Sequence, residues 1–121
     1  MDKDQTKNDL KTRCFCFGLT IIKFMDKLPN KRSAWVIEDQ LIRSSTSIGA
    51  NLVEAKSSSS RLEFKKFNEI ALKSANETIY WLELLKAVGL LPSGEIDKLL
   101  NEAGQLANMI GSGVIKLKKS L

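Results

Sequence analysis

The chain of 121 residues contains no histidine, only two cysteines and only two prolines. Without histidine, a zinc site lacks its usual nitrogen ligand, and a di-metal site in a helix bundle lacks its Glu-x-x-His pairs. Cys14 and Cys16 lie two positions apart, so on a helix they point to different faces and make a poor metal site or disulfide. We therefore expect no metal and no cofactor, and two reduced cysteines packed as small apolar side chains.

Long apolar runs are also missing, since no stretch approaches the roughly 20 residues that a membrane helix needs. Lys11 and Arg13 precede a short apolar stretch over residues 14–22, which has some features of a signal peptide. Acidic residues near the N-terminus, Lys23 and the lack of an A-x-A cleavage site make that interpretation weak. We expect a cytoplasmic protein without membrane contact, folded as a single domain over residues 1–121.

Apolar residues recur at steps of three and four along the whole chain, and no alternating strand pattern competes with them. The predicted helices cover about residues 8–28, 33–57, 60–89 and 93–119. Four helices of this length with short connections predict an all-α, up-down-up-down four-helix bundle.

The predicted helix boundaries depend on recognisable end signals. Pro29 ends the first helix, and Ser33 is the expected N-cap of the second. Ser60 and Glu63 fit the capping box S-x-x-E at the start of the third helix, and Gly89 ends it.

Three of the predicted helices carry a second set of apolar positions outside their main seam. The set comprises Phe15, Leu19, Ile22 and Met25 in the first helix, Leu72, Ile79 and Leu82 in the third, and Leu100, Ala107, Val114 and Leu121 in the fourth. A bundle helix needs only one apolar stripe, so two stripes favour a buried subunit interface and a homo-oligomer. The alternative is a wide, irregular core with a few exposed apolar side chains.

The second helix carries a polar stripe that is unusual for a bundle. Its members Arg43, Ser47, Asn51 and Glu54 recur at steps of four, four and three and share one face. In a hairpin with the third helix, Arg43 lies level with residues 74–77, and Glu54 lies near Arg61. We expect a structural network formed by Arg43, Ser47, Asn51, Glu54, Ser74 and Glu77, with Arg43–Glu77 and Glu54–Arg61 as buried or half-buried ion pairs.

Two other interpretations of the stripe stay open, a binding surface and a catalytic site. Glu54 could act as a general base, but no nucleophile with its own base and no metal-ligand cluster accompanies it. We therefore expect no enzyme activity.

The net charge of +5 is concentrated at one end of the predicted bundle. That end holds eleven of the nineteen basic residues, Lys3 and Lys7 among them, and five of the fourteen acidic residues, so it carries +6 and the remainder −1. Clustered Lys and Arg attract phosphate backbones with little sequence preference and strong salt dependence. The candidate nucleic-acid contacts are Lys11, Arg13, Lys56, Arg61, Lys65, Lys66, Lys116, Lys118 and Lys119. Solvated charge is the alternative, because lysines also suit a helix C-terminus.

The stripe and its surroundings resemble a family of bacterial helical proteins. The resemblance is carried by Arg43, Ser44, Ser47, Ile48, Asn51, Glu54, Arg61, Glu63, Phe64, Ala71, Leu72, Ser74 and Glu77. This pattern is similar to that of the 23S rRNA intervening-sequence proteins, also called the S23 family. The resemblance implies a four-helix bundle that assembles into a homopentamer, encoded within ribosomal RNA genes or standing alone. Relatives usually have a basic G-R-R-S-like turn where this chain has residues 57–60, all serine.

The family is in turn similar to the accessory variability determinant of diversity-generating retroelements, a pentameric basic protein that partners a reverse transcriptase. The resemblance therefore implies a pentameric ring that binds RNA or DNA without sequence specificity, as an accessory to a ribonucleoprotein or reverse-transcriptase complex. No helix-turn-helix, zinc finger or RNP-type aromatic motif indicates sequence-specific recognition. The alternative function is a protein-interaction scaffold with no role in nucleic-acid binding.

Overall fold

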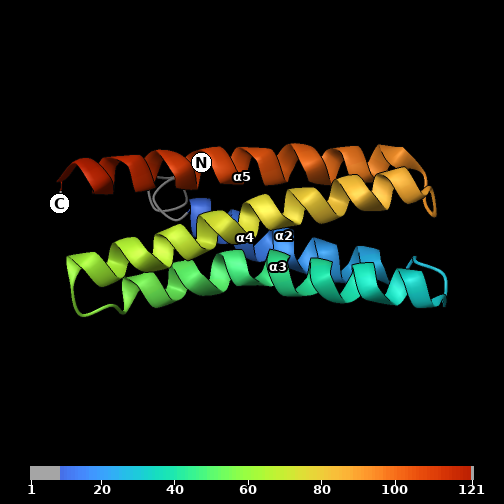
Figure 1. The fold of residues 1–121 in the computed structure, drawn as a ribbon, viewed down its shortest axis with the longest axis horizontal. Coiled ribbons are helices and arrows are strands. Elements are labelled where there is room, and N and C mark those ends of the chain that lie inside the picture. The colour runs from blue at the N-terminus through green and yellow to red at the C-terminus, as the bar shows by residue number, and fades with distance from the viewer. Residues whose placement is uncertain (1–8, 121) are drawn as a thin grey trace.

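The computed structural model describes residues 9–120, which form four α-helices and, within that range, no strand (Figure 1). The helices are α2 (Asp9–Met25), α3 (Arg32–Lys56), α4 (Arg61–Val88) and α5 (Ser93–Ser120). The predicted all-α bundle is confirmed.

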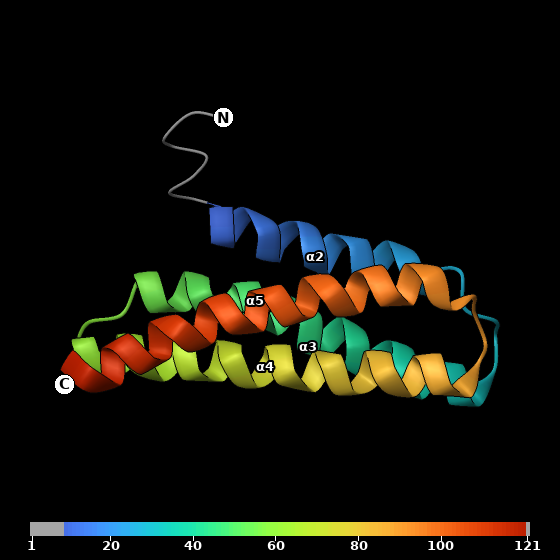
Figure 2. The ribbon, with the colours of Figure 1, turned by 90° about the horizontal axis from the view of Figure 1, so that it is seen from above.

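Each helix packs against the helix that precedes or follows it, and α2 also packs against α5. Within the described residues, the diagonal pairs α2–α4 and α3–α5 make no comparable contact. Seen from above, α2 and α4 accordingly lie at opposite sides of the bundle (Figure 2). This closed order of antiparallel neighbours is the up-down-up-down arrangement.

The predicted seams form the core. The buried side chains include Cys14, Phe17, Ile21 and Phe24 of α2, Leu41, Ile48 and Leu52 of α3, Ala71, Leu82 and Leu85 of α4, and Ile96, Leu99, Leu106 and Ile110 of α5. Their burial removes a continuous apolar surface from water and supplies the main stabilising contribution.

The second apolar set divides into three groups among the described residues. Met25, Leu82, Ala107 and Val114 are buried in the core, and Leu72, Ile79 and Leu100 are partly buried against it, so α4 and α5 contribute wide apolar faces to the monomer itself. Phe15, Leu19 and Ile22 remain exposed, at 73, 42 and 41%. Leu121 lies outside the described residues. An unpartnered apolar stripe therefore remains on α2.

Two predicted helix ends need correction. Helix α2 ends at Met25 rather than at residue 28, because i→i+3 bonds from Lys27 N to Phe24 O (3.0 Å) and from Leu28 N to Met25 O (3.1 Å) tighten the chain before Pro29. The predicted start at residue 8 lies outside the described residues.

The predicted N-cap of α3 is also wrong. Helix α3 begins at Arg32, after an extended Lys31 whose side chain makes no capping bond, and Ser33 lies inside the first turn. A hydrogen bond from Trp35 Nε1 to Asn30 Oδ1 (2.7 Å) links this first turn to the preceding loop.

The end signals of α4 are confirmed. Ser60 Oγ accepts a bond from Glu63 N at 3.0 Å, and Gly89 adopts the left-handed conformation with φ 76°. The carboxylate of Glu63 accepts from Ser59 N (3.3 Å), one residue before the usual partner in a capping box.

Across residues 9–120, none of the helices is both long enough and apolar enough to cross a bilayer.

Candidate functional site

The polar stripe of α3 forms a hydrogen-bonded network with α4. Asn51 Nδ2 donates to Ser47 Oγ at 2.9 Å, and the Ser74 hydroxyl bonds to the same oxygen from α4, also at 2.9 Å. Ser74 is buried, and Ser47 and Asn51 are half-buried. The structure thus brings these three predicted members of the network together, and their polar groups are paired within the protein.

A second bridge across α3 and α4 was not predicted from the sequence. The Thr78 hydroxyl bonds to the Ser44 hydroxyl at 2.9 Å and to the Ser74 carbonyl at 2.8 Å, and the Thr78 and Ser44 side chains are fully buried. The only available signal was that Thr78 and Ser74 are the two hydroxyl residues in an otherwise apolar seam of α4. Such buried hydroxyls need partners on the facing helix.

Arg43 and Glu77 form the predicted ion pair at the solvent-facing margin of this interface. Gln40 Oε1 also accepts from Arg43 Nη2 at 2.8 Å, and Glu77 Oε2 accepts from Trp81 Nε1 at 2.9 Å. The Arg43 and Glu77 side chains are 56 and 36% exposed, so the pair lies in solvent rather than in the core.

Glu54 lies outside the network, and its predicted pair with Arg61 is wrong. The Glu54 side chain is exposed and makes no hydrogen bond or ion pair within residues 9–120. Arg61 Nη2 instead donates to Ser120 Oγ at 2.8 Å, because the first turn of α4 meets the last turn of α5 there. Glu54 also lines neither of the two hollows described below.

The serine turn over residues 57–60 is occupied by capping bonds. Ser58 Oγ donates to Ala55 O at 2.6 Å, Ser59 Oγ bonds to Glu63 Oε2 at 3.4 Å, and Ser60 caps α4. The Ser58 and Ser60 hydroxyls thus pair with free backbone groups at the two helix ends, whereas the Ser59 hydroxyl pairs with the Glu63 side chain. We infer that the turn's first role is structural.

The basic residues predicted for one end of the bundle fall into distinct groups. Arg13 donates from Nε and Nη2 to the Glu102 carboxylate at 3.1 and 2.6 Å and to Gln105 at 2.8 Å, so it links α2 to α5. Lys65 has an acidic neighbour one turn away, Glu69, at 3.5 Å. The charge of Arg13 is thus neutralised within the protein, and we leave it out of the interface proposed below.

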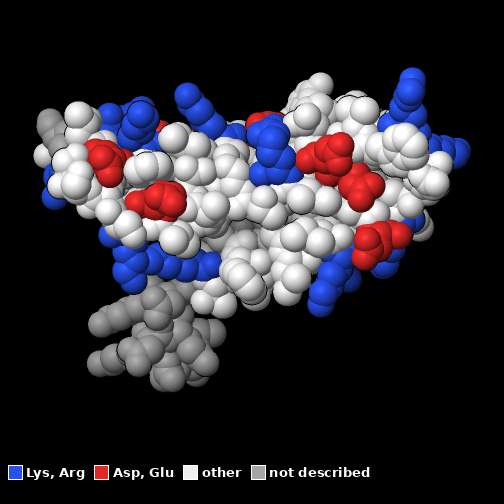
Figure 3. Space-filling view, turned by 90° about the horizontal axis from the view of Figure 1, so that it is seen from below, with Lys and Arg blue, Asp and Glu red and all other residues white. Residues whose placement is uncertain are grey.

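The other predicted contacts have no ion pair within residues 9–120. They are Lys11, Lys56, Arg61, Lys66, Lys116, Lys118 and Lys119. The hydrogen bond between Arg61 and Ser120 shows that the start of α4 lies beside the lysine-rich end of α5. Lys3 and Lys7 lie outside the described residues. On the face seen in Figure 3, basic side chains occur at both ends of the molecule and alternate with acidic ones.

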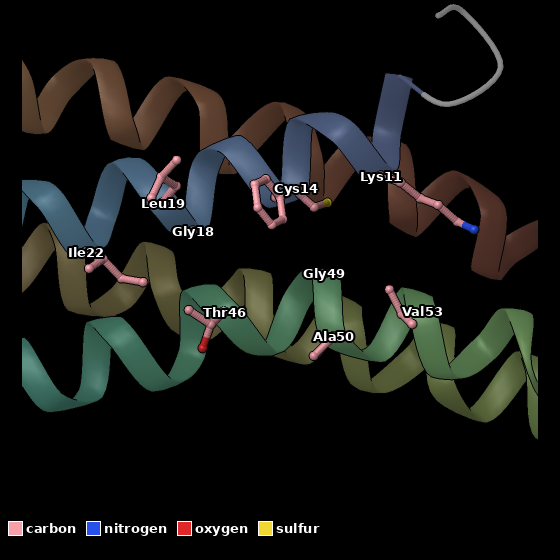
Figure 4. A pocket seen from close by; sticks show the side chains of 10 residues that line it. Lys11, Cys14, Gly18, Leu19, Ile22, Thr46, Gly49, Ala50 and Val53 are labelled. Atoms are coloured by element: carbon pink, nitrogen blue, oxygen red, sulfur yellow. The ribbon is translucent and has the colours of Figure 1, made fainter. Parts of the chain in front are cut away.

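A hollow of about 370 Å³ runs between α2 and α3 on the opposite side of α3 from its polar network. It is lined by Lys11, Cys14, Phe15, Gly18, Leu19, Ile22, Thr46, Gly49, Ala50 and Val53. Figure 4 shows Ile22, Leu19 and Cys14 along α2 opposite Thr46, Ala50 and Val53 along α3. We call this hollow the apolar groove.

The two cysteines differ in their surroundings. Cys14 is buried at the wall of the apolar groove. Burial is the main cause that raises the pKa of its thiol to about 11, and the negative charge of Glu102 is the second cause. Cys16 is exposed, so the expectation that both cysteines pack as small apolar side chains is wrong for Cys16. Their placement on different faces of α2 follows the prediction.

These features define a class of protein, an antiparallel four-helix bundle. Its polar stripe is closed against a neighbouring helix, and the start of α4 lies beside the lysine-rich end of α5. The sequence matches the profile of the 23S rRNA-intervening sequence protein family over residues 6–112, and the chain belongs to this family. No curated protein matches the sequence.

A similar solved structure is that of a protein of unknown function from the S23 ribosomal protein family of Bacteroides thetaiotaomicron VPI-5482. The two sequences are 34% identical, and the match covers 87% of this chain and 97% of that chain with a TM-score of 0.81. The further relation to the accessory proteins of diversity-generating retroelements stays a prediction.

Proposed function

We propose that the protein is a non-enzymatic, oligomeric helical-bundle protein whose basic end contacts RNA or DNA without sequence specificity. The observation that carries this proposal is that seven of the nine predicted contact residues have no ion pair within residues 9–120. Unpaired cations attract a phosphate backbone and release its counterions, whereas paired cations have little charge to offer. The names of the family and of the similar structure refer to ribosomal RNA and to ribosomal protein, which is consistent with an RNA partner.

The test compares two variants with the same change of charge. One replaces Lys65, Lys66, Lys116, Lys118 and Lys119 by Gln. Its matched control replaces Lys23, Lys27, Lys31, Lys86 and Lys98, all near the opposite end of the helices, by Gln. We expect the wild type and the control to bind an RNA or DNA probe at roughly 50 mM salt and to lose it steeply as salt rises.

The basic-end variant should bind weakly and with a shallower salt dependence, since each phosphate contact that is lost reduces the slope by about 0.9. Binding that is unchanged in this variant, or lowered equally in both variants, would overturn the proposal. If the wild-type protein binds neither RNA nor DNA at roughly 50 mM salt, the result would instead favour a protein-interaction scaffold.

We propose further that copies of the chain associate through the exposed apolar side chains of α2. Phe15, Leu19 and Ile22 form one apolar strip, and Val53 of α3 continues it at 59% exposure. Burial of such a strip is the usual reason for a stable subunit contact. Light scattering should show an assembly for the wild type and for a Val36→Lys control, and single chains for Leu19→Lys. An unchanged mass for Leu19→Lys excludes this surface.

The reverse-transcriptase version of the proposal makes a narrower statement about the partner. It requires that the protein co-purify with a reverse transcriptase encoded beside it, and that a template repeat lie nearby. A gene within a ribosomal RNA locus, with no reverse transcriptase, would favour the ribonucleoprotein version.

A further inference from the structure

A second hollow, of about 300 Å³, lies where the start of α2, the end of α3 and the first turns of α4 meet. We call it the corner hollow. Leu10, Leu52 and Ala55 give it apolar walls, and Lys11 and Lys56 add two ammonium groups. Its size is at the lower limit of hollows that hold small molecules, and it combines apolar walls with a few polar groups as such sites do.

The two lysines at the corner hollow lie close together without a carboxylate between them. Neither Lys11 nor Lys56 has an ion pair within residues 9–120. The pKa of Lys11 is lowered, first by partial burial and then by the neighbouring Lys56, as expected for two ammonium groups that lie near each other. An anion placed between them would remove this repulsion.

An aromatic ring and an amide lie beside the lysines. Phe64 lines the corner hollow and is 38% exposed, so part of its surface is open to a ligand. Asn68 Nδ2 donates to Phe64 O at 2.9 Å, while Asn68 Oδ1 accepts no hydrogen bond within the described residues. Exposed aromatic rings next to cations are the usual components of sites for single-stranded nucleic acid, because every base can stack on a ring.

We propose that the corner hollow binds one nucleotide of a single strand, with its base against Phe64 and its phosphate between Lys11 and Lys56. Asn68, which lines the hollow, would offer its Oδ1 as an acceptor for an amino group of the base. This inference rests on the proposed function and adds a preference for single strands over duplexes. In a duplex the base is already stacked and paired, and extruding it costs a few kcal/mol.

The test uses one short oligonucleotide of mixed sequence, both alone and annealed to its complement. Phe64→Leu removes the ring and keeps an apolar side chain. Tyr80→Leu is the matched control, because Tyr80 is an exposed aromatic residue of the same helix that does not line the corner hollow. Lys56→Gln tests the phosphate contact at an exposed position, where the substitution leaves the fold undisturbed.

We expect Phe64→Leu to weaken single-strand binding about tenfold, in the range found for loss of one stacked base, and to leave duplex binding unchanged. Phe64→Trp should restore it, Tyr80→Leu should have no effect, and Lys56→Gln should weaken binding and lower the salt slope.

Equal loss of single-strand and duplex binding in Phe64→Leu would overturn the stacking site and give Phe64 a structural role. Unchanged binding in Phe64→Leu, together with lost binding in the basic-end variant, would overturn the corner hollow and leave the proposed function standing. A wild type that binds neither probe at roughly 50 mM salt would overturn both.

Discussion

The two interfaces of α3 are built from small residues in opposite ways. Toward α4, α3 presents Ser44 and Ser47, whose hydroxyls bond across the interface. Toward α2, it presents Gly49 and Ala50, neither of which has a side-chain group that can form a hydrogen bond. The first interface is closed by paired polar groups, while the second is left partly open as the apolar groove.

This difference shows which surface remains available to a partner. A buried hydroxyl that already has a hydrogen-bond partner gains no free energy by binding a ligand. Breaking its bond would leave two buried polar groups unpaired, each with a desolvation penalty. An apolar groove has no such internal partner, so covering it with another apolar surface is favourable. The polar stripe, which has the composition of a binding site in the sequence, is thus mainly structural. The apolar groove is the surface of α3 that remains open to a partner.

The largest expected effect comes from placing the same side chain at each interface. Ser44→Leu puts a large side chain into the closed interface, where the residue is fully buried, and should lower the free energy of unfolding by about 3 kcal/mol. Ala50→Leu faces the apolar groove and should change it by no more than about 0.5 kcal/mol. Urea unfolding of the two variants at one protein concentration measures both values.

The control for this comparison is the mass of each variant in solution, because a change of assembly also changes the apparent stability. Equal losses in the two variants would show that the groove is as tightly closed as the α3–α4 interface, which would contradict the comparison.

Most of the fold follows from the sequence because apolar spacing determines which face of each helix is buried. The seam positions Phe17, Ile21 and Leu85 are buried as their spacing predicts. The capping box at Ser60 and the left-handed Gly89 follow from local backbone chemistry, which a sequence states directly.

The site was harder to predict, because its details depend on the relative positions of two helices. To predict the pair of Ser44 with Thr78, one must know the register of α3 against α4, and the turn over residues 57–60 sets that register. The same uncertainty produced the wrong pair of Glu54 with Arg61, whose partner is on α5. Net charge likewise did not reveal that Arg13 is neutralised by Glu102, 89 positions away.

The second prediction separates the value of a hydrogen bond from the cost of leaving a group unpaired. Thr78→Val keeps the shape of the side chain but leaves the Ser44 hydroxyl without its partner, and should cost about 1–2 kcal/mol. Adding Ser44→Ala removes the unpaired group and should recover part of that loss. If the double variant were less stable than the sum of the two single changes, the hydroxyls would not act as a pair, and the closed interface would owe its stability to packing alone.

The smallest expected effect concerns Arg43, whose pair with Glu77 lies at the exposed margin of the closed interface. Arg43→Met retains the apolar stem and removes the charge, and it should lower the free energy of unfolding by about 0.5 kcal/mol at low salt. At about 1 M salt the difference from the wild type should vanish, because the Debye length falls to about 3 Å and the pair is open to solvent. Glu77 keeps its bond from Trp81 Nε1 in this variant, so no buried acceptor is left without a partner. Urea unfolding at the two salt concentrations measures the effect. A loss of unfolding free energy above about 2 kcal/mol that persists at high salt would mean that the ion pair stabilises the α3–α4 interface as strongly as the buried hydroxyls do. The distinction between the closed centre of that interface and its solvated margin would then be wrong.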